Sequence, residues 1–391
     1  MSTTAATSSD FLKSPLRVLA SLRLTVVCLG IGMLLVFLGT LAQVNLGIHA
    51  VQAKYFQSLF VFWSPAGAGW KIPILPGGYL LGTVLLVNLI AAHATRFQFS
   101  KKKIGIILLH LGVILLLVGQ LLTGLFARET QMRLDEGQTL GYSDAPREVE
   151  LAVIDVTNPD YDQVVAIPEK VVARGGTIQN PTLPFTLQIK RFLPNSHVAM
   201  RSQESDAPPS PATTGLGTDI VVAEVPRTVK DDERDLSAAF VEVSGVNGSL
   251  GTWLVSNAIM DPQSLTVNGR TYELVMRQRR FYKQFALTLL HFAHDRYAGT
   301  DIPKNFSSRV RLIDSERNEN REVLISMNDP LRYRGFTFYQ AGFDNNDKTT
   351  ILQVVRNPAM LLPYIACGLV ALGLVTQFSM HLFGFVKKRE R

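Results

Sequence analysis

Two histidines, His93 and His110, lie inside strongly apolar stretches of the sequence. A polar side chain costs free energy inside a lipid bilayer, so one found at lipid depth is a candidate functional residue. Neutral imidazole is an axial ligand of haem iron, and the small neighbours Ala92 and Gly112 leave room for a flat ring. Two structural alternatives remain open: each imidazole hydrogen-bonds a neighbouring helix, or it reaches toward the membrane interface.

The other five histidines have weaker patterns. His291 and His294 end a strand-like run, where positions three apart point to opposite faces, so they form a poor metal pair unless the chain turns at Ala293. His381 follows the middle of the last apolar stretch and can reach the same depth as His93. The last two lie in predicted loops, where nothing indicates a role: His49 and His197.

Four stretches are long and apolar enough to cross a bilayer, which takes about 20 residues in a helix. They are 24–44, 75–95, 104–126 and 359–385, and none has a charged residue within its core. The first is longer than the apolar region of a signal peptide, about 7–15 residues, and no small-residue cleavage site follows it. We therefore expect it to remain as a membrane anchor.

Lysine and arginine flank these stretches in three clusters, which predicts the orientation of the chain. The clusters are Lys13 with Arg17 and Arg23, then Arg96 with Lys101–Lys103, and finally Lys387–Arg391. With four spans all three clusters fall on one side, so both termini are expected in the cytoplasm. The 45–73 loop and the 127–356 segment then face the opposite side. In a bacterium this is the periplasm or the exterior.

The same orientation places the first two histidines at one depth. His93 and His110 lie on either side of the short connection between the second and third spans. At 1.5 Å rise per residue, both imidazoles are roughly 5–10 Å from the inner interface. They are therefore placed as ligands or neighbours of one buried group would be.

The segment 127–356 alternates apolar and polar residues in short runs bounded by turn residues, which is typical of strands. Such spacing predicts an all-β domain of the sandwich or open-barrel kind. The expected organisation is 1–126 with three spans, 127–356 as an extracytoplasmic β domain, and 357–391 with the fourth span. The predicted strands are Glu148–Val156, Phe185–Phe192, Phe240–Ser244, Tyr272–Arg277, Phe285–Leu290, Arg309–Ile313, Arg321–Met327, Phe336–Phe343 and Thr350–Val355.

Composition excludes several functional classes. The net charge is +7, but the basic residues gather beside the apolar stretches, which indicates membrane topology and not nucleic-acid binding. The two cysteines, Cys28 and Cys367, lie in apolar stretches and no CxxC or CxxCH occurs, which argues against a thiol oxidoreductase or covalently attached haem. No nucleophile–base pattern, phosphate loop or HExxH occurs, so the sequence does not predict an enzyme acting by itself.

A specific motif carries a family resemblance that extends over nearly the whole chain. Its centre is Asp301–Val310 followed by Met327–Phe343, with the run Pro330-Leu-Arg-Tyr-Arg-Gly335. Together these segments resemble the ResB family of cytochrome c biogenesis proteins. Further similar segments are Leu38–Thr40, His110–Gly112, Glu136–Gln138 and Arg356–Pro358.

The resemblance implies a membrane subunit of a cytochrome c synthase complex in the bacterial plasma membrane. Such a subunit helps carry haem b across the bilayer and presents it to apocytochrome c. The family's partner is a tryptophan-rich membrane protein of the ResC or CcsA type. This chain has only Trp63, Trp70 and Trp253, in no cluster, so it would need that partner as a separate polypeptide.

The resemblance also bears on particular residues. A histidine of the second span is a haem ligand in the family, and His93 fits that place. His110 is a weaker candidate, because a histidine of the partner can supply the second axial bond. Arg332 and Arg334 are suited to haem propionates, or alternatively to acidic residues of the domain or the partner.

Two other functional classes remain as alternatives to haem delivery. An extracytoplasmic ligand-binding module that signals across the membrane would need a cytoplasmic domain, and the predicted inner segments are short. A structural anchor subunit of another membrane complex would leave cytochrome c maturation unaffected by its loss.

Overall fold

The chain divides into two compact units, a helical unit and a β unit. The helical unit runs up to Arg128 and resumes at Arg356, and the β unit is Glu129–Val355. The computed structural model describes residues 17–65, 69–96, 100, 103–203, 208–229, 233–299, 303–344 and 348–389. Outside these ranges fall Lys13, Lys101, Lys102 and Arg391 of the basic clusters and Asp301 and Ile302 of the ResB-like motif.

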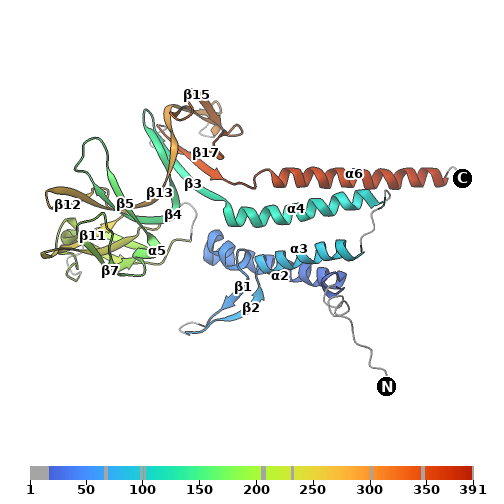
Figure 1. Cartoon of the computed structure of the whole chain (residues 1–391), viewed down its shortest axis with the longest axis horizontal. Helices are drawn as coiled ribbons and strands as arrows, with labels where there is room; N and C mark the ends of the chain where they lie inside the picture. The colour runs from blue at the N-terminus through green and yellow to red at the C-terminus, as the bar shows by residue number, and fades with distance from the viewer. Residues whose placement is uncertain are drawn as a thin grey trace, which may run out of the picture. The chain divides into compact units, whose positions relative to one another are not determined.

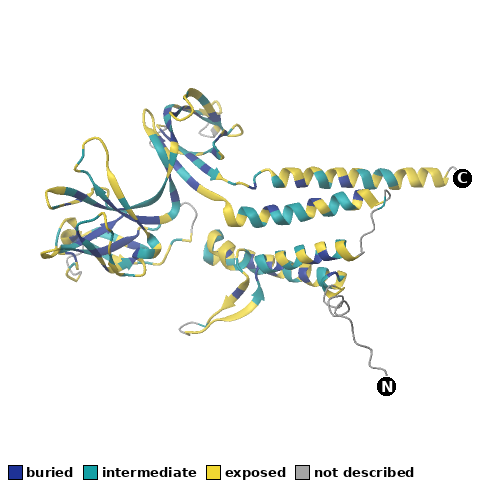
Figure 2. Cartoon of the chain, in the orientation of Figure 1, coloured by how far each residue is buried: buried dark blue, intermediate teal, exposed yellow. Residues whose placement is uncertain are grey.

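The described residues include four helices that are long and apolar enough to cross a membrane, as predicted (Figure 1). Much of each of these helices is exposed, as the yellow segments in Figure 2 show. The exposed residues include large apolar side chains such as Phe37 and Phe378. Helices that are apolar on their exposed faces are typical of membrane spans, so the chain is a membrane protein. The four helices are α2 (Leu22–Val51), α3 (Gly78–Arg96), α4 (Ile104–Phe126) and α6 (Leu362–Arg389).

The segment 45–73, predicted as a loop, is largely ordered structure. Gly47 adopts a φ of 71°, which interrupts α2 and lets the chain change direction. The π-helix η1 (Gln52–Phe56) follows, and its Phe56 ring packs onto Gly39 of α2. The chain then forms a hairpin of two strands before α3: β1 (Phe60–Trp63) and β2 (Ile72–Pro76).

Helices α4 and α6 pack closely through small residues. Glycines recur at seven-residue spacing along α4, and a Cβ added at Gly112 would lie 2.6 Å from Val370 Cγ2 and 2.8 Å from the Ala366 carbonyl oxygen. Small residues allow such close approach of helices in lipid. Gly112 therefore serves the contact with α6 and does not make room for a flat ring. The packed glycines of α4 are Gly105, Gly112 and Gly119.

A buried amide joins α3 to the start of α2. Asn88 Nδ2 donates to the carbonyl oxygens of Leu19 (2.5 Å) and Ser21 (3.1 Å). The Thr25 hydroxyl donates to Asn88 Oδ1 at 2.7 Å. Because these bonds satisfy the amide within the protein, they fix the start of α2 against α3 at lipid depth.

The β unit contains one large sheet and one four-stranded sheet. The large sheet has the order β15-β14-β13-β4-β3-β18-β17-β16, with β12 beside β13 and β5 beside β4. Its two ends meet, because β15 contacts both β16 and β17, so this part is a nearly closed barrel. Its strands are β3 (Arg128–Asp135), β4 (Thr139–Asp155), β5 (Gln163–Pro168), β12 (Gln263–Val267), β13 (Arg270–Arg296), β14 (Pro303–Asp314), β15 (Glu319–Ser326), β16 (Leu331–Tyr333), β17 (Phe336–Asp344) and β18 (Thr349–Arg356).

The smaller sheet has the order β11-β10-β7-β6. Its strands are β6 (Gly176–Ile178), β7 (Thr186–Leu193), β10 (Ala238–Gly245) and β11 (Gly248–Ser256). The remaining short elements are the hairpin β8 (Ser196–Met200) and β9 (Ile220–Glu224), the helix α5 (Glu169–Val172) and the 3-10 turns η3 (Arg201–Gln203) and η4 (Leu216–Asp219).

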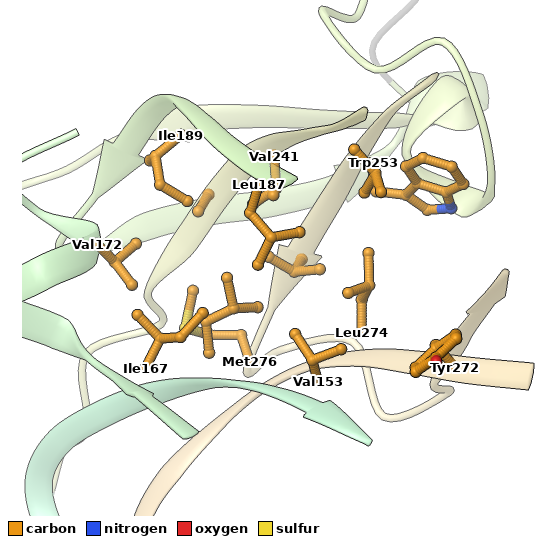
Figure 3. Packing of buried hydrophobic residues seen from close by; sticks show 14 of the residues in the cluster. Val153, Ile167, Val172, Leu187, Ile189, Val241, Trp253, Tyr272, Leu274 and Met276 are labelled. Carbon is orange, nitrogen blue, oxygen red and sulfur yellow. The ribbon is translucent and has the colours of Figure 1, made fainter. Parts of the chain in front are cut away.

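The long strand β13 takes part in two separate cores. Near its start, Tyr272 and Met276 pack against β7, β10 and β11, which makes a sandwich (Figure 3). Near its end, Phe285 and Phe292 lie in the barrel core with β14, β17 and β18. The β unit is therefore a sandwich joined to a barrel, which confirms the predicted all-β class.

All nine predicted runs fall largely within strands, but two of them belong to one element. The runs 272–277 and 285–290 are both parts of β13. The intervening residues, Gln278 to Gln284, are rich in charge and do not alternate, so the sequence suggests two strands. In the structure one strand runs through them, although its pairing with β4 shifts register after Gln278 and after Tyr282.

Lys283, in the middle of β13, is half-buried between polar and aromatic groups. Its ammonium donates to Ser143 Oγ and to the Phe281 carbonyl oxygen, and it lies 5.2 Å from the centre of the Phe336 ring. Burial lowers the pKa of Lys283 to about 8, although the charge of Asp144 acts to raise it.

We expect this lysine to make the stability of the β unit rise with pH. Between pH 8 and pH 10.5 the unfolded chain binds the proton that folded Lys283 has lost, so unfolding becomes less favourable as pH increases. Below pH 8 both states are protonated and the contribution is constant. The rise should disappear in Lys283→Met.

The fluorescence of Trp253, in the sandwich core, can follow the unfolding of the β unit when the full chain carries W63F/W70F and is held in detergent. The measurement is the midpoint of thermal unfolding at several pH values. An equal pH slope in Lys283→Met would contradict the assignment.

Candidate functional site

The structure brings the imidazoles of His93 and His110 together in the helical unit. Their ring centroids are 4.7 Å apart and the ring planes are nearly perpendicular, at 86°. His93 comes from α3 and His110 from α4, so the tight helical hairpin places them side by side as expected.

The hydrogen bonding of His93 favours one tautomer. Its Nδ1 lies 2.9 Å from the carbonyl oxygen of Leu89, one turn earlier in α3. Because a carbonyl oxygen only accepts, the proton is on Nδ1 and the lone pair is on Nε2. This is the arrangement of a metal-ligating histidine whose other nitrogen is held by the backbone.

The pair lines an apolar cavity of about 600 Å³ between α2, α3 and α4. This volume is in the usual range of small-molecule and cofactor sites, about 300–1,000 Å³. Most lining residues are aliphatic, such as Leu29, Leu85 and Val113, and Asn88 and Thr25 add polar atoms at one side. An apolar pocket with an imidazole suits a flat hydrophobic macrocycle that binds through its metal.

The two rings are too close to bind opposite faces of one macrocycle as they stand. A metal–nitrogen bond is about 2 Å long, so two imidazoles that bind one metal from opposite faces are separated by the plane of the macrocycle and by two such bonds. The observed centroid separation of 4.7 Å leaves no such space. The arrangement therefore supports one of the two histidines as a ligand and the other as its neighbour.

A second cavity of about 700 Å³ lies nearer the other end of α3 and α4. It is lined by glycines, by Tyr79 and by amides such as Gln43 and Gln120, and its described lining residues include no histidine or cysteine. Leu117 lines both cavities. The cavity at His93 is therefore the better candidate for binding a metal-containing ligand.

The remaining histidines do not form a metal site within the described ranges. His291 Nδ1 lies 2.9 Å from Glu136 Oε1, while the ring of His294 packs against Phe306 and Phe343, with centroids 4.7 and 4.6 Å away. Strand β13 continues through Ala293, so the turn that would bring these two histidines together is not formed. The other three lie apart from one another: His381 is hydrogen-bonded to Gln377 on α6, His49 is near the end of α2, and His197 is in β8.

Arg334 is engaged within the β unit. Its guanidinium pairs with Asp314 (2.7 Å) and Glu316 (2.9 Å), and its side chain is 13% exposed. Burial acts to raise the pKa of Asp314, but hydrogen bonds from Tyr333 and backbone amides and the charge of Arg334 together hold it below its usual value. A propionate would have to displace these carboxylates. Arg334 therefore follows the alternative prediction, in which it pairs with acidic residues of the domain.

Arg332 differs from its neighbour. It is exposed on the short strand β16, opposite Thr337 of β17, and no ion pair is found for it among the described residues. It is thus available to a ligand or partner with negative charge, and its contact with a propionate stays a prediction.

Fold and site together define a membrane protein with two parts: a helical unit that holds an apolar, imidazole-containing cavity, and a large β unit. A model of the ResB-like family matches residues 256–351, which lie within that β unit. The resemblance to the ResB family is therefore confirmed.

One similar protein adds to this match. Protein NrfI of Wolinella succinogenes is 25% identical over 319 residues, which cover 79% of this chain and 31% of NrfI. The chain thus spans about a third of the length of this relative.

Proposed function

We propose that the chain is a membrane subunit of a cytochrome c assembly system. It would bind haem b in the cavity at His93 and help present it outside the membrane to apocytochrome c for covalent attachment. The single observation that carries the proposal is the His93–His110 pair lining an apolar cavity in a ResB-like membrane protein.

In this proposal the residues of the cavity have separate tasks. His93 would hold the haem iron through Nε2, and the hydrogen bond from Nδ1 to the carbonyl oxygen of Leu89 fixes the orientation of its ring. His110 lies beside it, and the aliphatic walls exclude water from the macrocycle. Because the described lining residues include no charge, the propionates would reach toward Arg17 and Arg23, which flank the α2 wall in sequence.

The proposal includes a partner and an orientation. A tryptophan-rich membrane protein of the ResC or CcsA type would supply the second axial ligand and the attachment site. The basic residues at the helix ends support an orientation in which both termini would be in the cytoplasm of a bacterium, with the helices in the plasma membrane and the β unit outside.

Deleting the gene and staining membrane proteins for covalently bound haem tests this function. We expect the c-type cytochromes to lose their haem stain while b-type haem proteins keep their spectra. Supplying the full chain from a plasmid should restore the stain. Normal staining in the deletion strain would reject the proposal and would favour a structural anchor of another complex.

A further inference from the structure

The hairpin of β1 and β2 exposes an unusual amount of apolar surface for two short strands. Between residues 60 and 74, six large apolar side chains of the described residues are each at least 44% exposed, and two of them are tryptophan. An isolated two-stranded hairpin is at best marginally stable in water, so this one needs a surrounding that covers it. The six are Phe60, Phe62, Trp63, Trp70, Ile72 and Ile74.

The base of the hairpin is fixed to the membrane helices. Val61 is 1% exposed and, with Leu75, joins the core cluster of α2 and α3. At the other end, Ser64 Oγ donates to the carbonyl oxygen of Trp70 at 3.0 Å, which ties the two strands together. The hairpin lies in sequence between η1, which follows α2, and the first turn of α3, and Figure 1 shows it projecting sideways from these helices. It is thus held near the level where the helices leave the membrane.

The charge of this segment has one sign. Lys54 and Lys71 line a shallow cleft of about 750 Å³ together with Phe60, Phe62 and Trp63. No Asp or Glu occurs between residues 45 and 77. A cleft with lysines beside aromatic rings is complementary to an anionic headgroup with its acyl chains alongside.

The β2 edge of the hairpin is unsuited to pairing with a strand of another protein. Pro73 and Pro76 in β2 lack the N–H that an added strand would need, and prolines protect edges in this way. Apolar side chains also stand on both sides of the ribbon, since neighbouring residues Phe62 and Trp63 are both exposed. A protein groove covers one face of such a ribbon, whereas lipid surrounds both.

We propose that the β1–β2 hairpin is an interfacial anchor that inserts Trp63 and Trp70 among the lipids of the outer leaflet and binds anionic headgroups through Lys54 and Lys71. This anchor holds the ends of α2 and α3 at a fixed depth. It requires the four membrane helices and the predicted orientation of the chain, and it is independent of haem binding.

Quenching of tryptophan fluorescence by brominated lipids tests the insertion. The full chain is reconstituted into vesicles of phosphatidylcholine and phosphatidylglycerol, with bromine on the acyl chains. We expect the bromine to quench a large part of the wild-type emission, and the quenched part to vanish in W63F/W70F, where only the buried Trp253 remains. Equal quenching in the two proteins, or none in either, would overturn the proposal.

The headgroup preference needs a separate comparison. With bromine placed only on phosphatidylglycerol, quenching should exceed that seen with bromine only on phosphatidylcholine at the same mole fraction. This difference should disappear in K54Q/K71Q, which leaves the tryptophans in place. Equal quenching by the two lipids in the wild type would reject the role of the lysines.

A photo-crosslinking residue at Phe62 distinguishes lipid from a protein partner in native membranes. We expect no adduct with a second polypeptide. A discrete higher-mass adduct would assign this surface to a protein partner and overturn the proposal.

Discussion

Replacing His93 with alanine is expected to remove most of the haem b that purifies with the chain and its partner. The substitution removes the imidazole that lines the cavity and whose Nδ1 is hydrogen-bonded to the Leu89 carbonyl oxygen, which leaves Nε2 as the nitrogen able to bind iron. Changing even the groups that orient a metal ligand costs about 10–100-fold in affinity, so loss of the ligand itself should cost at least about tenfold. The measurement is haem content and the b-type absorption spectrum of the purified complex.

Two further variants separate ligation from packing. His381→Ala removes a histidine on α6 that is bonded to Gln377, and it should leave the haem content unchanged. Imidazole added to His93→Ala should restore part of the spectrum, because it can occupy the space left by the side chain. An unchanged spectrum in His93→Ala would show that the ligand lies elsewhere.

His110→Ala should have a smaller effect. Its Nδ1 is buried without a hydrogen-bond partner in the described part of the chain, but its ring is too near His93 for both to bind one iron. We expect a shifted spectrum with most of the haem retained. This pattern would agree with a second axial ligand from the partner.

The membrane helices were predictable because their signal is local. A long apolar stretch has few stable alternatives in water or lipid, so its sequence is sufficient. The hairpin was missed because Phe60 to Trp63 is a continuous apolar run, and Ile72 to Pro76 contains two prolines. Only the pairing of the two segments identifies them as strands, and pairing is not local information.

The candidate site was predictable only as far as its signal is local. The short connection between α3 and α4 fixed the depth of His93 and His110, but the direction in which each helix turns its side chain depends on packing. Gly112 shows this, since its small size serves α6 and not the cavity. Arg334 shows it again, because Asp314 reaches it only through the curvature that brings β14 near β16, where Tyr333 also bonds Asp314.

Helix packing in the lipid should be most sensitive at Gly112. In Gly112→Val the added Cβ would meet Val370 Cγ2 at 2.6 Å and the Ala366 carbonyl oxygen at 2.8 Å, so α4 and α6 must separate. Overpacking of a close contact costs typically about 1–3 kcal/mol, and a contact with backbone cannot be relieved by a change of rotamer. We therefore expect a loss of about 2–3 kcal/mol in the free energy of unfolding, measured by denaturation of the full chain in mixed micelles.

Gly368→Val is the matched control, because it places the same side chain on α6 where a Cβ has no atom within 4 Å. It should change stability little, so the difference between the two variants isolates the contact between α4 and α6. Gly112 is also two residues from His110, and separation of α4 from α6 should displace that ring relative to His93. Equal stability of the two variants would mean that the glycines of α4 do not determine this packing, and the geometry of the cavity would then have to be maintained by α2 and α3, through Asn88 and Thr25.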